Sequence, residues 1–231
     1  SHHGSSGRRC PSFVLWTSQG AASRGAGAAR SAMFVVASFF LLSIERFLYG
    51  YIYHFPESFK QVCNGPLKSA LDFAEGKYWM VAKHLGVVIK VFQFGVIGYD
   101  LLSRPVGLAS VPLLSVGALL VGAGQVLNAA VFNAIGAVGV YYGGQLGEKV
   151  PWCSGFPYNL GFGDPQYWGV VLFVWGLYVA LAGASMDGQL LRHVVVPVWT
   201  TFWYVMSMKV LEDTKNGTAV LRSFGLKRAA A

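Results

Sequence analysis

The chain has 231 residues, a length that accommodates one or two ordinary domains. Hydrophobic residues make up 54% of it and charged residues 12%, which is about half the charged share of an average soluble domain. This composition excludes a disordered chain, a collagen and a coiled coil, and it argues against a small aqueous enzyme. The net charge of +8 would indicate nucleic-acid binding in a polar protein, so the positions of the basic residues decide its meaning.

The first 31 residues form a region of their own. They begin Ser-His-His-Gly-Ser-Ser-Gly without Met, a start typical of a tag scar or a truncated translation. The region is basic and contains no acid, since the first acid of the chain is Glu45. This pattern fits a disordered leader or an organelle transit peptide. We therefore expect a disordered leader over 1–31, a single membrane domain over 32–211 and a cytosolic tail over 212–231.

The apolar residues of the chain gather in long segments. Nearly uncharged stretches run from Tyr78 to Tyr99, Val106 to Tyr142, Pro165 to Met186 and Leu190 to Leu211. A helix of about 20 apolar residues crosses a bilayer core, so each of these stretches is long enough. A fifth stretch within 32–55 is interrupted by Glu45 and Arg46, and it either spans the membrane or lies partly in it. The sequence predicts an all-α, polytopic membrane bundle with about four to five membrane segments.

The stretch from Val106 to Tyr142 is too long for a simple span. Its 37 residues would make a helix of about 55 Å, whereas the bilayer core is roughly 30 Å thick. The helix must therefore tilt, break or project from the membrane, and Pro112 and the glycines offer break points. Glycines 139, 143 and 147 follow at four-residue spacing, which predicts a ridge for close helix packing.

The basic residues near the C-terminus indicate the orientation. Lys209, Lys215, Arg222, Lys227 and Arg228 flank or follow the last apolar segment. By the positive-inside rule this end is cytosolic. The positive charge then reflects the leader, the orientation signal and attraction to anionic lipid, and we expect no nucleic-acid partner.

The connection from 147 to 169 is the main polar interruption between the apolar segments. It is rich in proline, glycine and aromatic residues. Asp164 precedes Pro165, and helix capping alone can explain this aspartate. The aromatic side chains fit an interfacial belt or a site that holds a cation between aromatic faces.

Motifs of common enzyme classes are absent from the sequence. It contains no GxSxG, HExxH, CxxC or Walker sequence, so serine hydrolase, zinc protease, redox and P-loop chemistry lack support. Three scattered cysteines, Cys10, Cys63 and Cys153, make neither a disulfide framework nor a metal cluster. We expect no metal site.

Four short motifs, taken in their order along the chain, resemble those of the phospholipid N-methyltransferase family. They are Gly122-Ala123-Gly124, Phe156-Pro157-Tyr158-Asn159, Asp164-Pro165-Gln166-Tyr167-Trp168-Gly169 and Glu212-Asp213. The resemblance covers roughly Ala118 to Gly217. By itself the glycine motif would indicate helix packing, and the acidic pair a solvated tail, so the order of the motifs carries the resemblance.

The resemblance implies S-adenosyl-L-methionine as cofactor. It implies as cofactor contacts Gly122, Ala123, Gly124, Glu212 and Asp213, and we add the aromatic Tyr167 and Trp168. This chain departs from the family at two places. The acidic pair is commonly Glu-Glu in the family, and the (N/H)-P-x-Y motif begins here with Asp164.

The chemistry implied by the resemblance is attack of a lipid amine on the methyl group of a sulfonium, which requires no protein nucleophile. Asp164, Glu148 and His193 are candidate bases for the amine proton. Candidate substrate contacts are Tyr158, Asn159, Lys83 and Lys90.

The expected activity is methylation of phosphatidylethanolamine derivatives, the mono- and dimethyl forms above all, to give phosphatidylcholine. The alternatives are an isoprenylcysteine-type carboxyl methyltransferase and a non-catalytic multi-pass scaffold or transporter. We expect an integral protein of the endoplasmic reticulum, with a plastid or mitochondrial membrane as the alternative location.

Overall fold

The computed structural model describes residues 33, 36–37, 39–41, 43–102, 110–161, 163–181, 190–213 and 216–223. The predicted leader therefore lies outside the described residues. The helices are α2 (Pro56–Asn64), α3 (Lys68–Phe73), α4 (Tyr78–Leu102), α5 (Val111–Val140), α6 (Pro165–Leu181), α7 (Leu190–Met206) and α8 (Asn216–Ser223). Helical residues 43–54, here called the N-terminal segment, precede α2. Short 3-10 (Tyr158–Leu160) and π-helical (Ser207–Leu211) turns complete the described elements, which include no strand.

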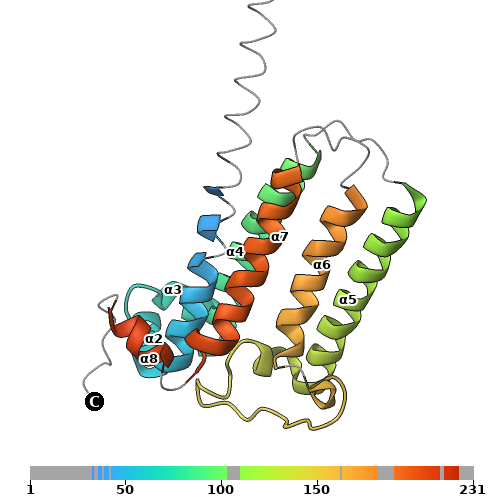
Figure 1. Ribbon diagram of the computed structural model, residues 1–231. Coiled ribbons are helices and arrows are strands. Elements are labelled where there is room, and N and C mark those ends of the chain that lie inside the picture. Colours follow the sequence, from blue (N-terminus) through green and yellow to red (C-terminus); the bar gives the residue numbers. More distant parts are fainter. Residues whose placement is uncertain are drawn as a thin grey trace, which may run out of the picture.

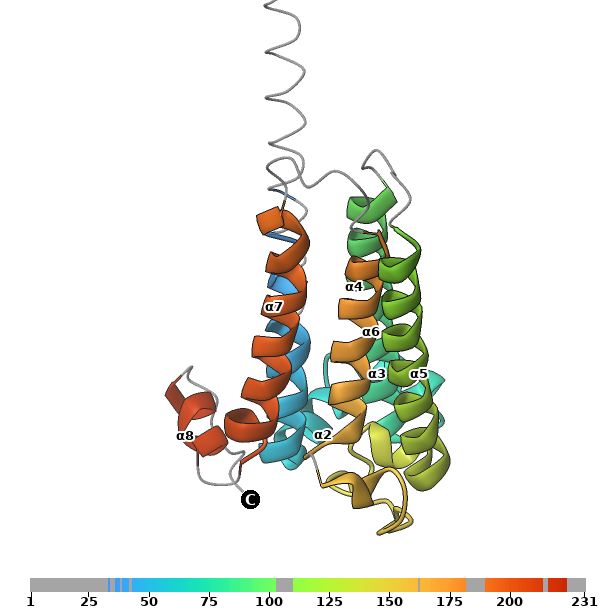
Figure 2. The same ribbon diagram turned by 45° about the vertical axis from the view of Figure 1, so that its right-hand side comes forward.

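The four long helices α4, α5, α6 and α7 run side by side (Figures 1 and 2). The N-terminal segment lies beside α7 (Figure 2). Phe47 of this segment packs edge-to-face against Trp203 of α7, with ring centroids 5.4 Å apart. The short helices α2, α3 and α8 lie at the lower end of the molecule, the same end as the loop that joins α5 to α6 (Figure 1). The lower end is therefore the broad, irregular end of the molecule.

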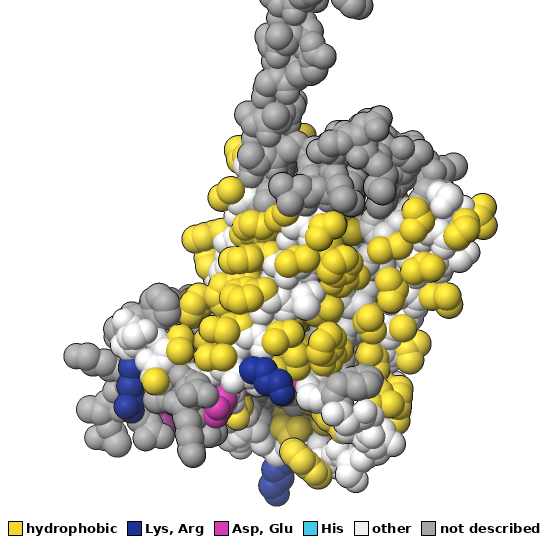
Figure 3. Space-filling view, viewed as in Figure 1, with side chains coloured by type: hydrophobic (Ala, Val, Ile, Leu, Met, Phe, Trp, Pro, Cys, Tyr) yellow, Lys and Arg dark blue, Asp and Glu magenta, His cyan; other side chains and the backbone are white. Residues whose placement is uncertain are grey.

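Three of the four long helices contain stretches with the length and composition of membrane spans. Three stretches of the described residues qualify, Tyr78–Tyr99, Val111–Val140 and Val194–Leu211, and Pro165–Leu181 is a shorter apolar helix. Hydrophobic side chains cover the visible flank of the bundle, and the charged ones gather near its lower end (Figure 3). The predicted helical membrane bundle is confirmed.

The long apolar stretch breaks at a glycine. Helix α5 starts after Ser110 with Pro112 in its first turn, and Gly136 interrupts it with φ 66° and ψ 172°. This left-handed backbone favours glycine because it has no Cβ. Pro112 thus begins the helix rather than breaking it. The predicted glycine ridge is wrong, because α5 ends at Val140 and the two later glycines lie in turns.

Helices α5 and α6 approach closely through glycines. A Cβ on Gly124 would lie 2.5 Å from the carbonyl oxygen of Gly169, and one on Gly176 would lie 2.7 Å from that of Gly117. Gly117 and Gly124 are seven residues apart on α5, and Gly169 and Gly176 are seven residues apart on α6. The two backbones therefore lie in contact over about two helical turns. Small residues permit this packing in membrane bundles, where the hydrophobic effect between helices is weak.

The start of α6 confirms the capping interpretation of Asp164. Its Oδ1 accepts a hydrogen bond from the Gln166 backbone N–H at 3.0 Å, and Pro165 opens the helix. The cap satisfies one of the backbone donors that a helix start leaves free. It also fixes where the following Tyr167 points.

Gly124→Ala is expected to destabilise the bundle, whereas Gly122→Ala is not. A methyl group at position 124 would press on the backbone of α6, and overpacking of this kind costs about 1–3 kcal/mol. A methyl at position 122 would meet no atom within 4 Å and gains up to about 1 kcal/mol of helix propensity. Unfolding in detergent measures both changes, and equal stabilities for the two variants would contradict the packing described here.

Candidate functional site

A cavity of ≈ 340 Å³ is lined by residues from the C-terminal part of α5 and the start of α6. Its volume is within the range of small-molecule sites. Its charged and polar lining residues are Glu45, Arg46, Lys90, Gln125, Asn128, Asp164, Gln166 and Glu212, and its aromatic ones are Tyr49, Phe132, Tyr141, Tyr142, Tyr158, Tyr167 and Tyr204. The N-terminal segment, all four long helices and the α5–α6 connection therefore contribute to one site.

A buried carboxylate shared by two cations forms one wall of the cavity. Glu45 is 0% exposed, and its oxygens lie 2.7 Å from Arg46 Nη2 and 2.9 Å from Lys90 Nζ. Lys90 also donates to the Tyr204 hydroxyl at 2.6 Å and to the Gln93 side chain at 3.4 Å. Because one carboxylate faces two cations, this wall carries a net positive charge.

Arg46 is enclosed by tyrosine rings. Its guanidinium carbon lies 4.3 Å from the ring centre of Tyr204 and 5.0 Å from those of Tyr49 and Tyr167. Cations gain energy over aromatic faces, and more so when they are desolvated. This cage tethers the N-terminal segment to α6 and α7 at the site.

Glu212 faces the cavity from the end of α7. The Tyr142 hydroxyl donates to its Oε1 at 2.9 Å, the Tyr167 hydroxyl donates to the same atom, and the two hydroxyls lie 2.9 Å apart. No described residue donates to Oε2. Burial raises the pKa of Glu212, against the opposing effects of the tyrosine hydrogen bonds and of Arg46. The π-helical turn before Glu212 sets this orientation, and such turns are frequent at functional sites.

Asp164 and Tyr158 line the side of the cavity formed by the connection between α5 and α6. Burial raises the pKa of Asp164, and backbone hydrogen bonds and Arg46 oppose the shift. Burial, with a smaller effect of Asp164, raises the pKa of Tyr158 to about 12. The cavity therefore has two acidic groups whose affinity for protons is higher than in water, and phenol groups that stay neutral.

Part of the chain that builds this site is similar to known proteins. Residues 113–214 match the phospholipid methyltransferase family. The chain is also 40% identical over 53 residues to an Arabidopsis thaliana phosphatidyl-N-methylethanolamine N-methyltransferase. These residues are 23% of this chain, and they span about a third of the relative's length, 32%. No solved structure gives a significant match.

The match confirms the resemblance to phospholipid methyltransferases, and the structure shows how the predicted residues of that family are placed. Glu212, Tyr167, Asp164, Tyr158 and Lys90 line one cavity. They come from four separate stretches of the chain, so folding brings them together.

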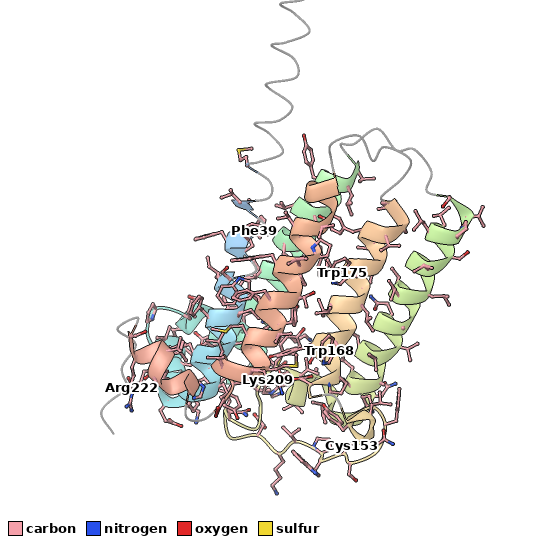
Figure 4. The ribbon with its side chains drawn as sticks, viewed as in Figure 1. Phe39, Cys153, Trp168, Trp175, Lys209 and Arg222 are labelled. Atoms are coloured by element: carbon pink, nitrogen blue, oxygen red, sulfur yellow. The ribbon has the colours of Figure 1, made fainter. Side chains whose placement is uncertain are left out.

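The other predicted contacts lie away from the cavity lining. Glu148 and Asn159 are exposed, and Asp213, Lys83 and Trp168 do not line it. Trp168 packs instead on the aromatic cluster around Tyr167 and Tyr204 near the start of α6 (Figure 4). The side chain of His193 lies outside the described residues.

The glycine motif does not line the cavity either. Gly122 and Ala123 are exposed on α5, and Gly124 is buried against α6. The next residue, Gln125, does line the cavity, and so does Asn128 one turn later. The structure thus gives Gly124 a packing role and brings two amide side chains of the same helix to the site.

Glu45 and Arg46 line the site but were not among the predicted functional residues. In the sequence they indicated only an interruption of an apolar stretch. The available signal was their position inside an apolar stretch, because ionisable residues in membrane segments are rare and usually functional. The partners Tyr142 and Tyr204 had no comparable signal, since tyrosines are common near membrane interfaces.

Glu45→Gln is expected to lower the free energy of unfolding by about 3–5 kcal/mol, since it leaves two buried or half-buried cations without their counter-charge. Glu57→Gln is the matched control, because Glu57 pairs with Lys60 at the same 2.7 Å but is 71% exposed. Exposed pairs contribute about 0–1 kcal/mol. Chemical denaturation in detergent measures both, and equal losses would contradict the buried network.

Proposed function

We propose that this protein is an integral-membrane, S-adenosylmethionine-dependent N-methyltransferase. Its acceptors would be the amine head groups of phosphatidylethanolamine derivatives, with the mono- and dimethyl forms favoured and phosphatidylcholine as the product. The observation that carries the proposal is the cavity in which Glu212 and Asp164 face tyrosine rings and a cationic wall. This cavity is built largely from the stretch that matches the phospholipid methyltransferase family.

The residues of the cavity fit the proposed methyl donor. S-adenosylmethionine supplies a methyl group bound to a positively charged sulfur. Aromatic faces and carboxylates are the groups that hold such a cation. Glu212, whose Oε2 has no donor among the described residues, and the rings of Tyr142 and Tyr167 would hold the donor. The predicted contacts at Gly122, Ala123, Gly124 and Asp213 would then act through the position of α5 and of the end of α7.

The same cavity fits a zwitterionic lipid head group. The phosphate would face the wall of Arg46 and Lys90, and the amine would face the carboxylates. A neutral amine is the form that attacks, so the lipid ammonium must lose a proton. Asp164 is the base we favour, because it lines the cavity and burial raises its pKa toward the range of a useful base. Catalysis then rests mainly on holding the two substrates in line.

The long apolar helices support a membrane location for the proposed enzyme. Three described stretches can cross a bilayer, so the lipid substrate would come from the surrounding membrane. We assign the protein to the endoplasmic reticulum with its C-terminus in the cytosol. The basic residues after the last span support this orientation.

The full chain in vesicles with methyl-labelled S-adenosylmethionine is expected to label N-methylated phosphatidylethanolamines. Glu212→Ala should raise the KM for the donor at least tenfold, because a lost charged contact of about 1.4 kcal/mol or more gives that factor. Label in a prenylated cysteine peptide instead would favour the carboxyl methyltransferase. A folded protein that labels no acceptor would overturn the proposal.

Donor binding is expected to weaken at acidic pH. Protonation removes the negative charge that attracts the donor, and burial raises the pKa of Glu212 and Asp164. Affinity should therefore fall as the pH drops through a value above the ordinary carboxyl range of about 4. Calorimetric titration between pH 4 and 8 measures this. Glu212→Gln should bind more weakly at neutral pH and lose part of the pH dependence, and a flat profile for the unmodified protein would exclude carboxylates from donor binding.

A further inference from the structure

An apolar groove of ≈ 400 Å³ lies between α4, α5 and α6, apart from the charged wall of the cavity. Its walls are Phe94, Ile97, Gly98 and Leu101 of α4, Gln125 and Asn128 of α5, and Val170, Phe173 and Leu177 of α6. The α4 and α6 residues recur every three or four positions, so each helix lines the groove with one face. The stretch from Phe94 to Leu101 covers about 10 Å along the helix axis.

The groove is continuous with the cavity. Gln125, Asn128 and Val170 line both spaces. The groove contains no charged side chain, whereas the cavity contains five. A molecule that filled both spaces would have a charged end and an apolar end.

The boundary between the two spaces is marked by two amide side chains. Gln125 and Asn128 lie one turn apart on α5, in the middle of the candidate span Val111–Val140. Neither side-chain amide is hydrogen-bonded to another described residue. Polar side chains at membrane depth are costly unless they have partners. The ester carbonyls of a phospholipid, which lie between its head group and its chains, are acceptors of the kind that these amides lack.

Gly98 keeps part of the groove open. A Cβ at this position would meet no atom within 4 Å. Glycine is a poor helix former in the middle of a helix. At this position it therefore leaves the groove open and does not stabilise the helix. Phe173 of α6 meets Phe94 of α4 edge-to-face with ring centroids 5.8 Å apart, so the two rings form a continuous part of the groove lining.

We propose that the groove binds an acyl chain of the phospholipid substrate while the head group occupies the cavity, with Gln125 and Asn128 as donors to its ester carbonyls. This inference rests on the proposed phospholipid acceptor and adds the route to it: the lipid enters from the bilayer between α4 and α5. The occupant is a diacyl lipid, because it joins a zwitterionic head to apolar chains through two ester carbonyls, one acceptor for each of the two amides.

The first test fills the groove. Gly98→Leu is compared with Gly95→Leu, a matched control on the same helix whose Cβ also meets no atom within 4 Å and which does not line the groove. Gly98→Leu should lower kcat/KM for a long-chain N-methylated phosphatidylethanolamine at least roughly tenfold. It should leave methylation of the deacylated glycerophospho head group, the donor Kd and the unfolding temperature at the values of Gly95→Leu. Equal turnover of the long-chain lipid by both variants, or an equal loss with both acceptors, would overturn the inference.

The second test does not depend on methyl transfer. A phospholipid with a diazirine on its acyl chain is irradiated with the full chain in vesicles, and the labelled peptides are identified by mass spectrometry. Labels on Phe94, Phe173 or Leu177 that disappear in Gly98→Leu and persist in Gly95→Leu are expected. Labels confined to the outer faces of the helices would refute the groove. Labelling of the groove by a protein that transfers no methyl group would refute the enzyme and keep the lipid site.

Discussion

The structure depends on one buried carboxylate. Glu45 lies out of solvent and pairs with both Arg46 and Lys90, and without this carboxylate the two cations would have no counter-charge in an apolar bundle. Lys90 brings α4 to this point and its bond to Tyr204 brings α7, while the rings around Arg46 bring α6. The ion pair therefore decides how the N-terminal segment and three long helices meet.

The other two carboxylates of the cavity are held differently. Glu212 is fixed by two phenol hydroxyls on a single oxygen, and Asp164 is fixed by the start of α6. Both acids are positioned by neutral donors and not by a direct ion pair of the described residues. Their charge is therefore available to a ligand. A cavity that presents both cationic and anionic groups suits molecules that carry both signs of charge, and both substrates of the proposed reaction do.

The packing of α5 and α6 explains how polar residues reach this cavity from an apolar helix. Glycine contacts bring the two backbones together on one face of α5. The neighbouring face then turns Gln125 and Asn128 toward the space between the helices. Gly124, the last residue of the glycine motif that suggested a cofactor site, packs α5 against α6. This contact positions Gln125 and Asn128 at the cavity.

The sequence by itself determined the membrane class, the α-helical spans and the family resemblance. Apolar length and the order of short motifs are properties of the chain alone, so these predictions needed no tertiary contacts. It also marked Glu212, Asp164 and Tyr167 as candidates, and the structure brings all three to the cavity. The sequence could not separate them from Glu148, Asn159 or Lys83, which have similar chemistry but do not line it.

Only the tertiary structure decided which residues share the site. Glu45 pairs with the adjacent Arg46 and with Lys90, which is 45 residues away in the sequence. Glu212 accepts hydrogen bonds from Tyr142, 70 residues before it, and from Tyr167, 45 residues before it. Contacts over such separations depend on how the helices pack, and hydropathy alone carries no information about packing faces in a helix that is apolar all round. The break at Gly136 was expected only as one of several glycines. The physical reason is the same in each case: apolar length places a helix in the membrane, whereas close backbone approach and buried charge decide its neighbours.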